Sequence, residues 1–425
     1  MTEARADNRV TMTHVAIVII VGIFATTLAQ PLVLARLPLQ NLLKNELHVS
    51  RTANAAFFFW CGLPWYFKPL AGILTDAFPV FGSRRRSYIL VATALACLAW
   101  IGVMFTPHIY ESLLGVCILI SLFMSVVSAV VGGYMVEAAQ ATAGSGRLTA
   151  MREFVQQASI FIRGPASGYL ASIAFGWTAA ACGGVMFLLV PATILFLHEQ
   201  RKSVPTREPL DNATRQLGKI ASAHTMWAAA GLMALFYIAP GVTTAVFYKQ
   251  QNELHMTTQA QGNLAVIAGA FGLLAAFVYS RACRRINLRR LLIVCLFAAT
   301  AANASYLFYN SVLDAKIIEG INGFGFTLAE LALMDLAVRA TPAGSEGLGF
   351  SLMMSVRNLA LFGTDWLGSA MIDKFHVRFD ALVLSNCATT LITVPLVLLL
   401  PRLLVQAKDD EPPEEVAVPA AMVQT

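Results

Sequence analysis

Long apolar runs recur along the whole chain and are separated by short polar stretches. A helix that crosses the hydrocarbon core of a bilayer needs about 20 mostly apolar residues, and twelve runs of that length can be read from the sequence. They lie near residues 13–35, 53–76, 87–106, 111–137, 150–173, 176–197, 225–248, 260–281, 289–309, 314–338, 347–372 and 380–404. The pattern predicts an all-α membrane protein with twelve transmembrane helices.

The longest polar break lies between the sixth and the seventh runs. We therefore expect an N-terminal six-helix bundle over residues 1–197, a cytoplasmic linker loop over 198–224 and a C-terminal six-helix bundle over 225–404. The remainder, 405–425, is acidic and rich in Pro and Ala, which is typical of a disordered tail.

Composition supports a membrane protein and narrows the possible chemistry. Hydrophobic residues make up 57% of the chain and charged residues 13%, whereas soluble domains carry roughly 25% charged residues. The seven cysteines form no C-x-x-C pair, and the sequence has no P-loop motif. We therefore expect no metal site, no cofactor and no ATP hydrolysis. The seven histidines lie in loops or near run ends, which argues against a histidine proton relay.

The basic residues indicate the orientation of the chain. If the N-terminus is cytoplasmic, the inside segments hold nineteen Lys and Arg residues and the outside loops hold six. Cytoplasmic loops are expected to carry this excess. The count predicts a multi-pass protein of the inner (plasma) membrane with both termini in the cytoplasm. Because the basic residues form short clusters between apolar runs, we expect no nucleic-acid partner.

The two halves of the sequence resemble each other. The fourth run ends in MVEAAQATAGSG (135–146) and precedes a run that carries Arg152, whereas the tenth ends in MDLAVRATPAGSEG (334–347) and precedes a run that carries Arg357. Basic loops also follow the second and the eighth runs. A repeat of six plus six helices is typical of transporters whose binding site lies at the midplane between two moving halves.

Five basic residues fall within the apolar runs, and each is costly there. A central Lys or Arg costs about 2.5 to 3.5 kcal/mol on insertion scales, so each must pair, reach the interface or face an aqueous cavity. The five are Lys68, Arg152, Arg163, Lys316 and Arg357. We expect Lys68, Arg163 and Arg357 to bind a substrate, although a permanent structural ion pair remains the alternative. Their positive charges point to an anionic solute.

Carboxylates and aromatic rings within the runs complete the expected binding site. Glu330 and Asp365 are candidates for substrate binding and for proton coupling, because a desolvated carboxyl group can change protonation when a cavity alternates. Uniport and exchange remain open. Trp65 and Phe236 are candidates for stacking against a ring, with packing as the alternative.

Other charges lie near the predicted cytoplasmic helix ends. Glu137, Arg152 and Asp335 occupy such positions. We expect them to form a gate between the halves rather than a substrate site.

The stretch LPWYFKPLAGILTDAFPVFGSRRRSYIL (63–90) resembles the signature of the folate–biopterin transporter family, a branch of the major facilitator superfamily. The matching residues are Pro64, Trp65, Lys68, Pro69, Gly72, Asp76, Pro79, Gly82, Arg84, Arg85, Arg86 and Tyr88. Segments 34–50 and 236–257 are also similar to that family. The resemblance implies the major facilitator fold, a folate or pterin-like substrate, and a role in the inner gate for Asp76 and Arg84, Arg85 and Arg86.

Two departures from the family pattern make the substrate less secure than the family. Gln30-Pro31 stands where the family has Gln-Gly, and Leu254 to Thr257 replaces Leu-Gly-Phe-Ser. We expect a monomeric secondary active transporter of a small organic anion and not an enzyme. The alternatives are a permease of the same superfamily for another solute, such as a muropeptide, and a non-transporting membrane sensor.

Overall fold

The computed structural model describes residues 2–83, 85–142, 145–197, 208–342 and 345–406, and the regular elements in these ranges are all helices. The first half contains α1 (Thr2–Leu28), α2 (Arg36–Asn45), α3 (Arg51–Cys61), α4 (Leu63–Tyr66), α5 (Lys68–Ala77), α6 (Arg86–Val103), α7 (Tyr110–Thr142), α8 (Ser145–Leu170), α9 (Phe175–Phe187) and α10 (Leu189–Phe196). The second half contains α12 (His224–Tyr237), α13 (Thr243–Asn252), α14 (Thr258–Ala282), α15 (Leu288–Ala304), η1 (Ser305–Phe308), α16 (Val312–Ala340), α17 (Glu346–Phe375), α18 (Phe379–Leu396), η2 (Val397–Leu399) and α19 (Arg402–Val405). Between them lies α11 (Glu208–Ser222), a helix within the stretch expected to be a loop.

Each of the twelve apolar runs coincides with one helix or with consecutive helices. The second run is divided into α3, α4 and α5, with Pro64 and Pro69 in the first turns of α4 and α5. A proline is tolerated at a first turn because the N–H it lacks has no intrahelical partner there. The seventh run is likewise divided into α12 and α13, around Pro240 and Gly241.

Seven helices of the described ranges are long and apolar enough to cross a membrane by themselves. They are α6, α7, α9 with α10, α14, α15 with η1, α16 and α18 with η2. The long helices α8 and α17 are not among them, because polar and charged residues lower their mean hydropathy. These two polar helices carry Arg152, Arg163, Arg357 and Asp365 among the functional candidates.

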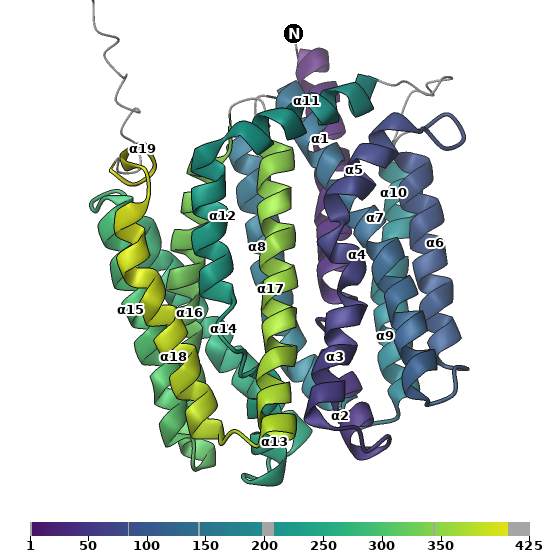
Figure 1. Ribbon diagram of the computed structural model, residues 1–425. Coiled ribbons are helices and arrows are strands. Elements are labelled where there is room, and N and C mark those ends of the chain that lie inside the picture. The colour runs from purple at the N-terminus through teal and green to yellow at the C-terminus, as the bar shows by residue number, and fades with distance from the viewer. Residues whose placement is uncertain (1, 84, 143–144, 198–207, 343–344, 407–425) are drawn as a thin grey trace, which may run out of the picture.

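The helices run side by side, as Figure 1 shows, with α2 and α13 together at one end of the molecule and α11 across the other. We refer to these as the α2–α13 end and the α11 end. Buried apolar side chains form one cluster within residues 18–197 and two clusters within residues 220–405. The acidic tail predicted from residue 405 lies outside the described residues from 407 onward.

Helices of the two halves meet along two lines of contact, α3 against α17 and α8 against α14. The second, which we call the glycine contact, brings backbones together at Gly164, Gly168 and Gly262. A Cβ atom on Gly262 would lie 2.9 Å from the Cα of Gly168 and still closer to the carbonyl oxygen of Gly164. Small residues at such crossings let membrane helices approach closely.

The corners that precede α3 and α14 are built alike. The tetrapeptide Asn-Glu-Leu-His occurs at both, and its histidine has a positive φ each time, 50° for His48 and 47° for His255. The side chains of Ser50 and Thr257 then cap the following helices. This local repeat places α2 and α13 in equivalent positions before α3 and α14.

Candidate functional site

A cluster of polar side chains lies among the apolar helices of the second half. Arg357 of α17 donates one hydrogen bond to Glu330 of α16 and forms an ion pair with it. It also donates to the hydroxyl of Tyr237 in α12 at 3.3 Å and to the side-chain oxygen of Asn358 at 3.0 Å. The guanidinium group stands 5.6 Å from the centre of the Tyr237 ring. Two predicted site residues, Arg357 and Glu330, are thus brought together.

The pairing makes this cluster electrically neutral but leaves it accessible. The side chains of Arg357 and Glu330 are 18% and 28% exposed, respectively. A buried ion pair is tolerated when its remaining donors and acceptors are satisfied, which Tyr237 and Asn358 help to do. The cluster offers hydrogen-bond donors and acceptors rather than a net charge.

Phe236 is buried beside the neutral cluster. Its ring packs edge-on against Tyr237, with centroids 5.0 Å apart, and lies 6.4 Å from the ring of Phe326. Phe236 therefore supports the position of Tyr237, and its own surface is largely covered.

Lys68 and Trp65 lie close together in the first half. The Lys68 ammonium donates a hydrogen bond to the Ser128 hydroxyl of α7 at 2.8 Å and stands 5.5 Å from the centre of the Trp65 ring. The Trp65 ring is thereby engaged by a cation of its own chain. Lys68 is the first residue of α5, directly after the break at Phe67 between α4 and α5.

Asp365 lies apart from the neutral cluster, against the break between α12 and α13. Its carboxylate accepts hydrogen bonds from the backbone N–H of Thr244 at 2.9 Å and from the Thr244 hydroxyl at 2.7 Å. Arg36, at the start of α2, approaches the same carboxylate at 3.7 Å. The two carboxylates expected to couple protons, Glu330 and Asp365, thus belong to different clusters.

Arg163 lies on α8, which packs against α2, and its charge and that of Arg36 repel each other. Its side chain is half-buried, and within the described part of the chain it has no hydrogen-bond or ion-pair partner. Among the described residues Arg163 is therefore a cation without a counter-charge.

Charged and polar side chains join α3 and α17 at the α2–α13 end. Asp373 accepts hydrogen bonds from the backbone N–H of Thr52 at 2.7 Å and from its hydroxyl at 2.9 Å. Arg51 pairs with the same carboxylate at 3.6 Å. The hydroxyl of Tyr248 in α13 donates to the carbonyl of Val49 at 2.9 Å. We call this set of bonds the polar contact.

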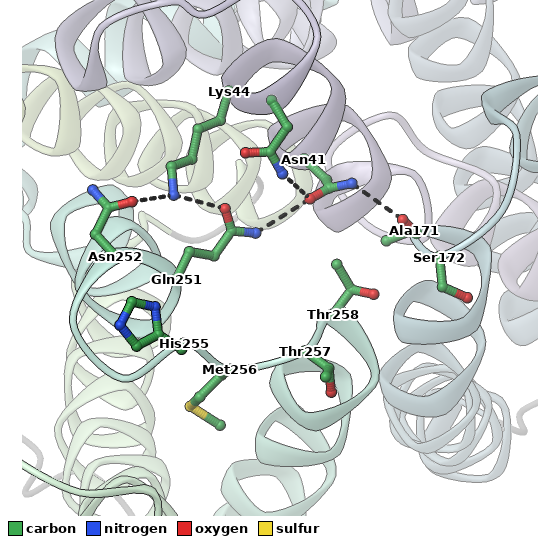
Figure 2. Close-up of a pocket in the computed structure, with 11 residues that line it drawn as sticks. Asn41, Lys44, Ala171, Ser172, Gln251, Asn252, His255, Met256, Thr257 and Thr258 are labelled. Carbon is green, nitrogen blue, oxygen red and sulfur yellow. Dashed lines mark hydrogen bonds between the residues drawn. The ribbon is translucent and has the colours of Figure 1, made fainter.

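An open pocket of about 710 Å³ adjoins the polar contact and is lined by both halves (Figure 2). Lys44 donates across it to the side-chain oxygens of Gln251, at 2.8 Å, and Asn252, at 2.5 Å. Gln251 donates in turn to Asn41 at 3.2 Å. Burial and the nearby charge of Arg51 lower the pKa of the Lys44 ammonium. These bonds tie α2 to α13 and close this end of the molecule.

The residues expected to form the inner gate lie at the α11 end. The Arg85 side chain is buried and packs against Gly133 of α7. A Cβ atom built on Gly133 would lie only 2.7 Å from a guanidinium nitrogen of Arg85. Arg86 donates to the carbonyl of Ile194 at 3.3 Å. The side chains of four further predicted gate residues lie outside those described: Asp76, Arg84, Glu137 and Arg152.

Asp335, the remaining predicted gate residue, is held within the second half. It accepts hydrogen bonds from Arg339, one turn later in α16, at 2.8 and 3.3 Å, and from the Tyr279 hydroxyl of α14 at 3.1 Å. These contacts link α14 to α16.

Sequence reasoning missed three residues of these clusters. They are Tyr237, Asp373 and Arg36, none of which the sequence pattern singles out. The repeated Asn-Glu-Leu-His corner was a usable signal, because it marks where α2 and α13 meet.

Solved structures establish the fold. A D-xylose–proton symporter aligns over 92% of this chain and 98% of its own, with a TM-score of 0.69 and 12% identity. A nucleoside transporter aligns over 92% of this chain and 99% of its own, with a TM-score of 0.66 and 10% identity. The all-α prediction is confirmed, and the chain has the fold of the major facilitator transporters.

Sequence comparison is more specific. The profile of the BT1 family matches residues 30–418, and the chain belongs to this family of folate–biopterin transporters. The folate-biopterin transporter of Synechocystis sp. is 26% identical over 92% of this chain and 84% of its own length. Folate transporter 1 of Plasmodium falciparum is 21% identical over 87% of this chain and 77% of its own. The predicted family is thus confirmed.

Proposed function

We propose that this protein carries a folate or pterin-like organic anion across the cytoplasmic membrane by alternating access, as a monomer. The family membership and the names of its relatives support the substrate class. The observation that carries the proposal furthest is the cluster of Arg357, Glu330 and Tyr237 on three helices. It presents fixed donors and acceptors, as a pterin edge requires, because that edge offers an amino group, a ring N–H and ring acceptors.

The proposal places the α2–α13 end outside the cell and the α11 end in the cytoplasm, with both termini inside. The excess of basic residues at the α11 end supports this orientation. A cysteine at position 84 tests it. Labelling of Arg84→Cys in intact cells should require a membrane-permeant reagent, and labelling by an impermeant reagent would invert the topology.

The division of the chain into two moving bundles, residues 1–197 and 225–404, is part of the proposal. Separate buried clusters in the two halves support it. The polar contact and the Lys44 bonds then belong to the closed outer gate. Opening of that gate requires their separation, while Asp76, Arg84, Arg85, Arg86, Glu137, Arg152 and Asp335 are proposed to act at the inner one.

Proton coupling is proposed for Glu330 and Asp365, which face different clusters along the same path. Uptake should then rise when the outside pH falls and collapse when a protonophore is added. Insensitivity to both treatments would exclude proton symport.

The decisive experiment measures uptake by liposomes that contain the purified protein. Labelled folate and biopterin should accumulate, whereas a labelled muropeptide should not. Empty liposomes are the control. Accumulation of the muropeptide alone would assign the protein to another solute, and accumulation of none of the three would contradict the proposed function.

A further inference from the structure

We propose that Arg36 and Arg163 form a subsite for a carboxylate of the substrate, and that this carboxylate competes with Asp365 for Arg36. The inference rests on the proposed function, which it deepens by assigning the acidic end of the substrate to named side chains.

The position of Arg36 is suited to such a subsite. It is the first residue of α2, which packs against α8. Its guanidinium group stands 5.2 Å from the centre of the Phe58 ring and 5.7 Å from that of Phe362. Contact with aromatic rings holds a guanidinium in place, and the Arg36 side chain remains 22% exposed, so that its fork of donors can bind a carboxylate.

Asp365 does not depend on Arg36 for its hydrogen bonds. Both of its oxygens already accept from Thr244, whereas the Arg36 nitrogen is 3.7 Å away, beyond ordinary hydrogen-bonding distance. Arg36 can therefore exchange Asp365 for another carboxylate without leaving a buried acceptor unpaired.

The positive charge of Arg163 has no counter-charge among the described residues of this region. Arg36, Arg163 and Asp365 together carry a net charge of about +1 at neutral pH, and Arg163 is unpartnered within the described residues. An unpaired cation at this depth is costly. A bound carboxylate would neutralise the cluster and remove the repulsion between the two arginines.

The subsite and the neutral cluster are separated along α17. Asp365 follows Arg357 by eight residues, which at 1.5 Å per residue is about 12 Å along the helix axis. A substrate with a polar ring at one end and a carboxylate at the other can reach both clusters. Folate has this form, whereas biopterin has the ring and no carboxylate. The subsite therefore contributes to the binding of folate and not to that of biopterin.

Competition for Arg36 also links binding to opening of the α2–α13 end. Arg36 belongs to the first half and Asp365 to the second. When a substrate carboxylate takes Arg36, the attraction between the halves at this point is lost. Binding of the substrate carboxylate thereby weakens a contact of the proposed outer gate.

The test compares Arg163→Gln and Arg36→Gln with the wild-type protein in liposomes. Folate uptake at low concentration should fall about tenfold to a hundredfold, the usual worth of a hydrogen bond to a charged group. Biopterin uptake should stay within about twofold of wild type by the same reasoning, since biopterin has no carboxylate to bind. Arg163→Lys should show more folate uptake than Arg163→Gln but less than the wild type, because lysine keeps the positive charge but lacks the paired N–H donors of the guanidinium.

Arg378→Gln is the matched control, since the Arg378 side chain is 85% exposed and pairs with Asp380 at 3.4 Å. It should leave both uptakes unchanged. Equal loss of folate and biopterin uptake in a folded Arg163→Gln protein would overturn the subsite, and so would normal folate uptake. Elution as a single peak on size-exclusion chromatography establishes folding.

Binding of p-aminobenzoylglutamate, the acidic half of folate without its pterin ring, separates this inference from the proposed function. It should raise the Tm of the wild-type protein in detergent but not that of Arg163→Gln. If the wild type transports neither pteridine yet shows this shift, the proposed function fails and the subsite stands. The absence of any shift in the wild type would overturn the subsite.

Discussion

Single charged residues in this protein are distinguished by the partners that the fold gives them. Arg357 and Arg163 are both intramembrane arginines on polar helices, yet the first is neutralised by Glu330 and the second has no partner among the described side chains. A paired cation contributes fixed hydrogen-bond geometry, whereas an unpaired one contributes charge. In the proposed function the same residue type thus serves two kinds of recognition.

Removing one partner of the Arg357–Glu330 pair should destabilise the protein. Glu330→Gln leaves a largely buried guanidinium without its counter-charge, and such losses reach about 3–5 kcal/mol when burial is complete. Because both side chains are partly exposed, we expect about 1–2 kcal/mol after discounting for solvent screening. The shift in Tm in detergent measures it.

The double variant Arg357→Met, Glu330→Gln separates stability from transport. It should recover most of the lost Tm, since no unpaired charge remains, but it should not recover uptake of folate or biopterin. Recovery of uptake together with stability would remove Arg357 and Glu330 from the substrate site.

The sequence singled out the two charged residues of the neutral cluster but not their pairing with each other. The cost of a charge in a bilayer singles out Arg357 and Glu330 without any structure. Arg36 escaped that argument because it lies just past the first apolar run. In the structure α1 ends at Leu28, and the chain turns back, so that Arg36 reaches Asp365 inside the bundle. Only tertiary folding could reveal this.

At the scale of helices, the apolar pattern predicted where the helices lie but not where two of the runs are divided into shorter helices. Every apolar run became helical, because a backbone within lipid must satisfy its own hydrogen bonds. The divisions within the second and seventh runs depend on local features, such as Pro69 and the Pro240-Gly241 pair. Lys68 and Thr244, which contact Ser128 and Asp365, lie beside these divisions.

The glycine contact between α8 and α14 gives a prediction at this scale. In Gly262→Ala the new methyl group would collide with the backbone of α8 at Gly164 and Gly168, and overpacking of this kind costs about 1–3 kcal/mol. The Tm should fall accordingly. Gly231→Ala in α12 is the matched control, since nothing lies within 4 Å of its Cβ position.

A fall in Tm for Gly231→Ala as large as that for Gly262→Ala would contradict a special role for close packing at this crossing. We expect Gly231→Ala instead to be neutral or slightly stabilising, because alanine favours helix more than glycine does.

At the scale of the whole molecule, the two halves are joined most extensively at the α2–α13 end. The polar contact, the Lys44 bonds and the Arg36–Asp365 pair all cross between them. The structure therefore represents a state closed at that end, and transport by alternating access requires these bonds to break and re-form in each cycle.

A disulfide across the polar contact should stop transport. Thr52→Cys, Asp373→Cys places one thiol on α3 and one on α17, where the native side chains are joined by a hydrogen bond, so oxidation should cross-link the two helices. Folate uptake should be lost on oxidation and return on reduction. Each single cysteine variant is a control, and unchanged uptake after verified cross-linking would show that this end need not open.

The two lines of contact between the halves differ in the force that holds them, and so they respond differently to ionic strength. The Arg51 and Asp373 side chains of the polar contact are 20% and 24% exposed, within reach of dissolved ions that screen charge over about 8–10 Å. The glycine contact consists of touching backbones and contains no charge to screen. Added salt therefore weakens the attachment of α3 to α17 and leaves that of α8 to α14 intact. In the proposed transport cycle we therefore expect the halves to separate by rotation about the α8–α14 line, at a rate that increases with salt concentration.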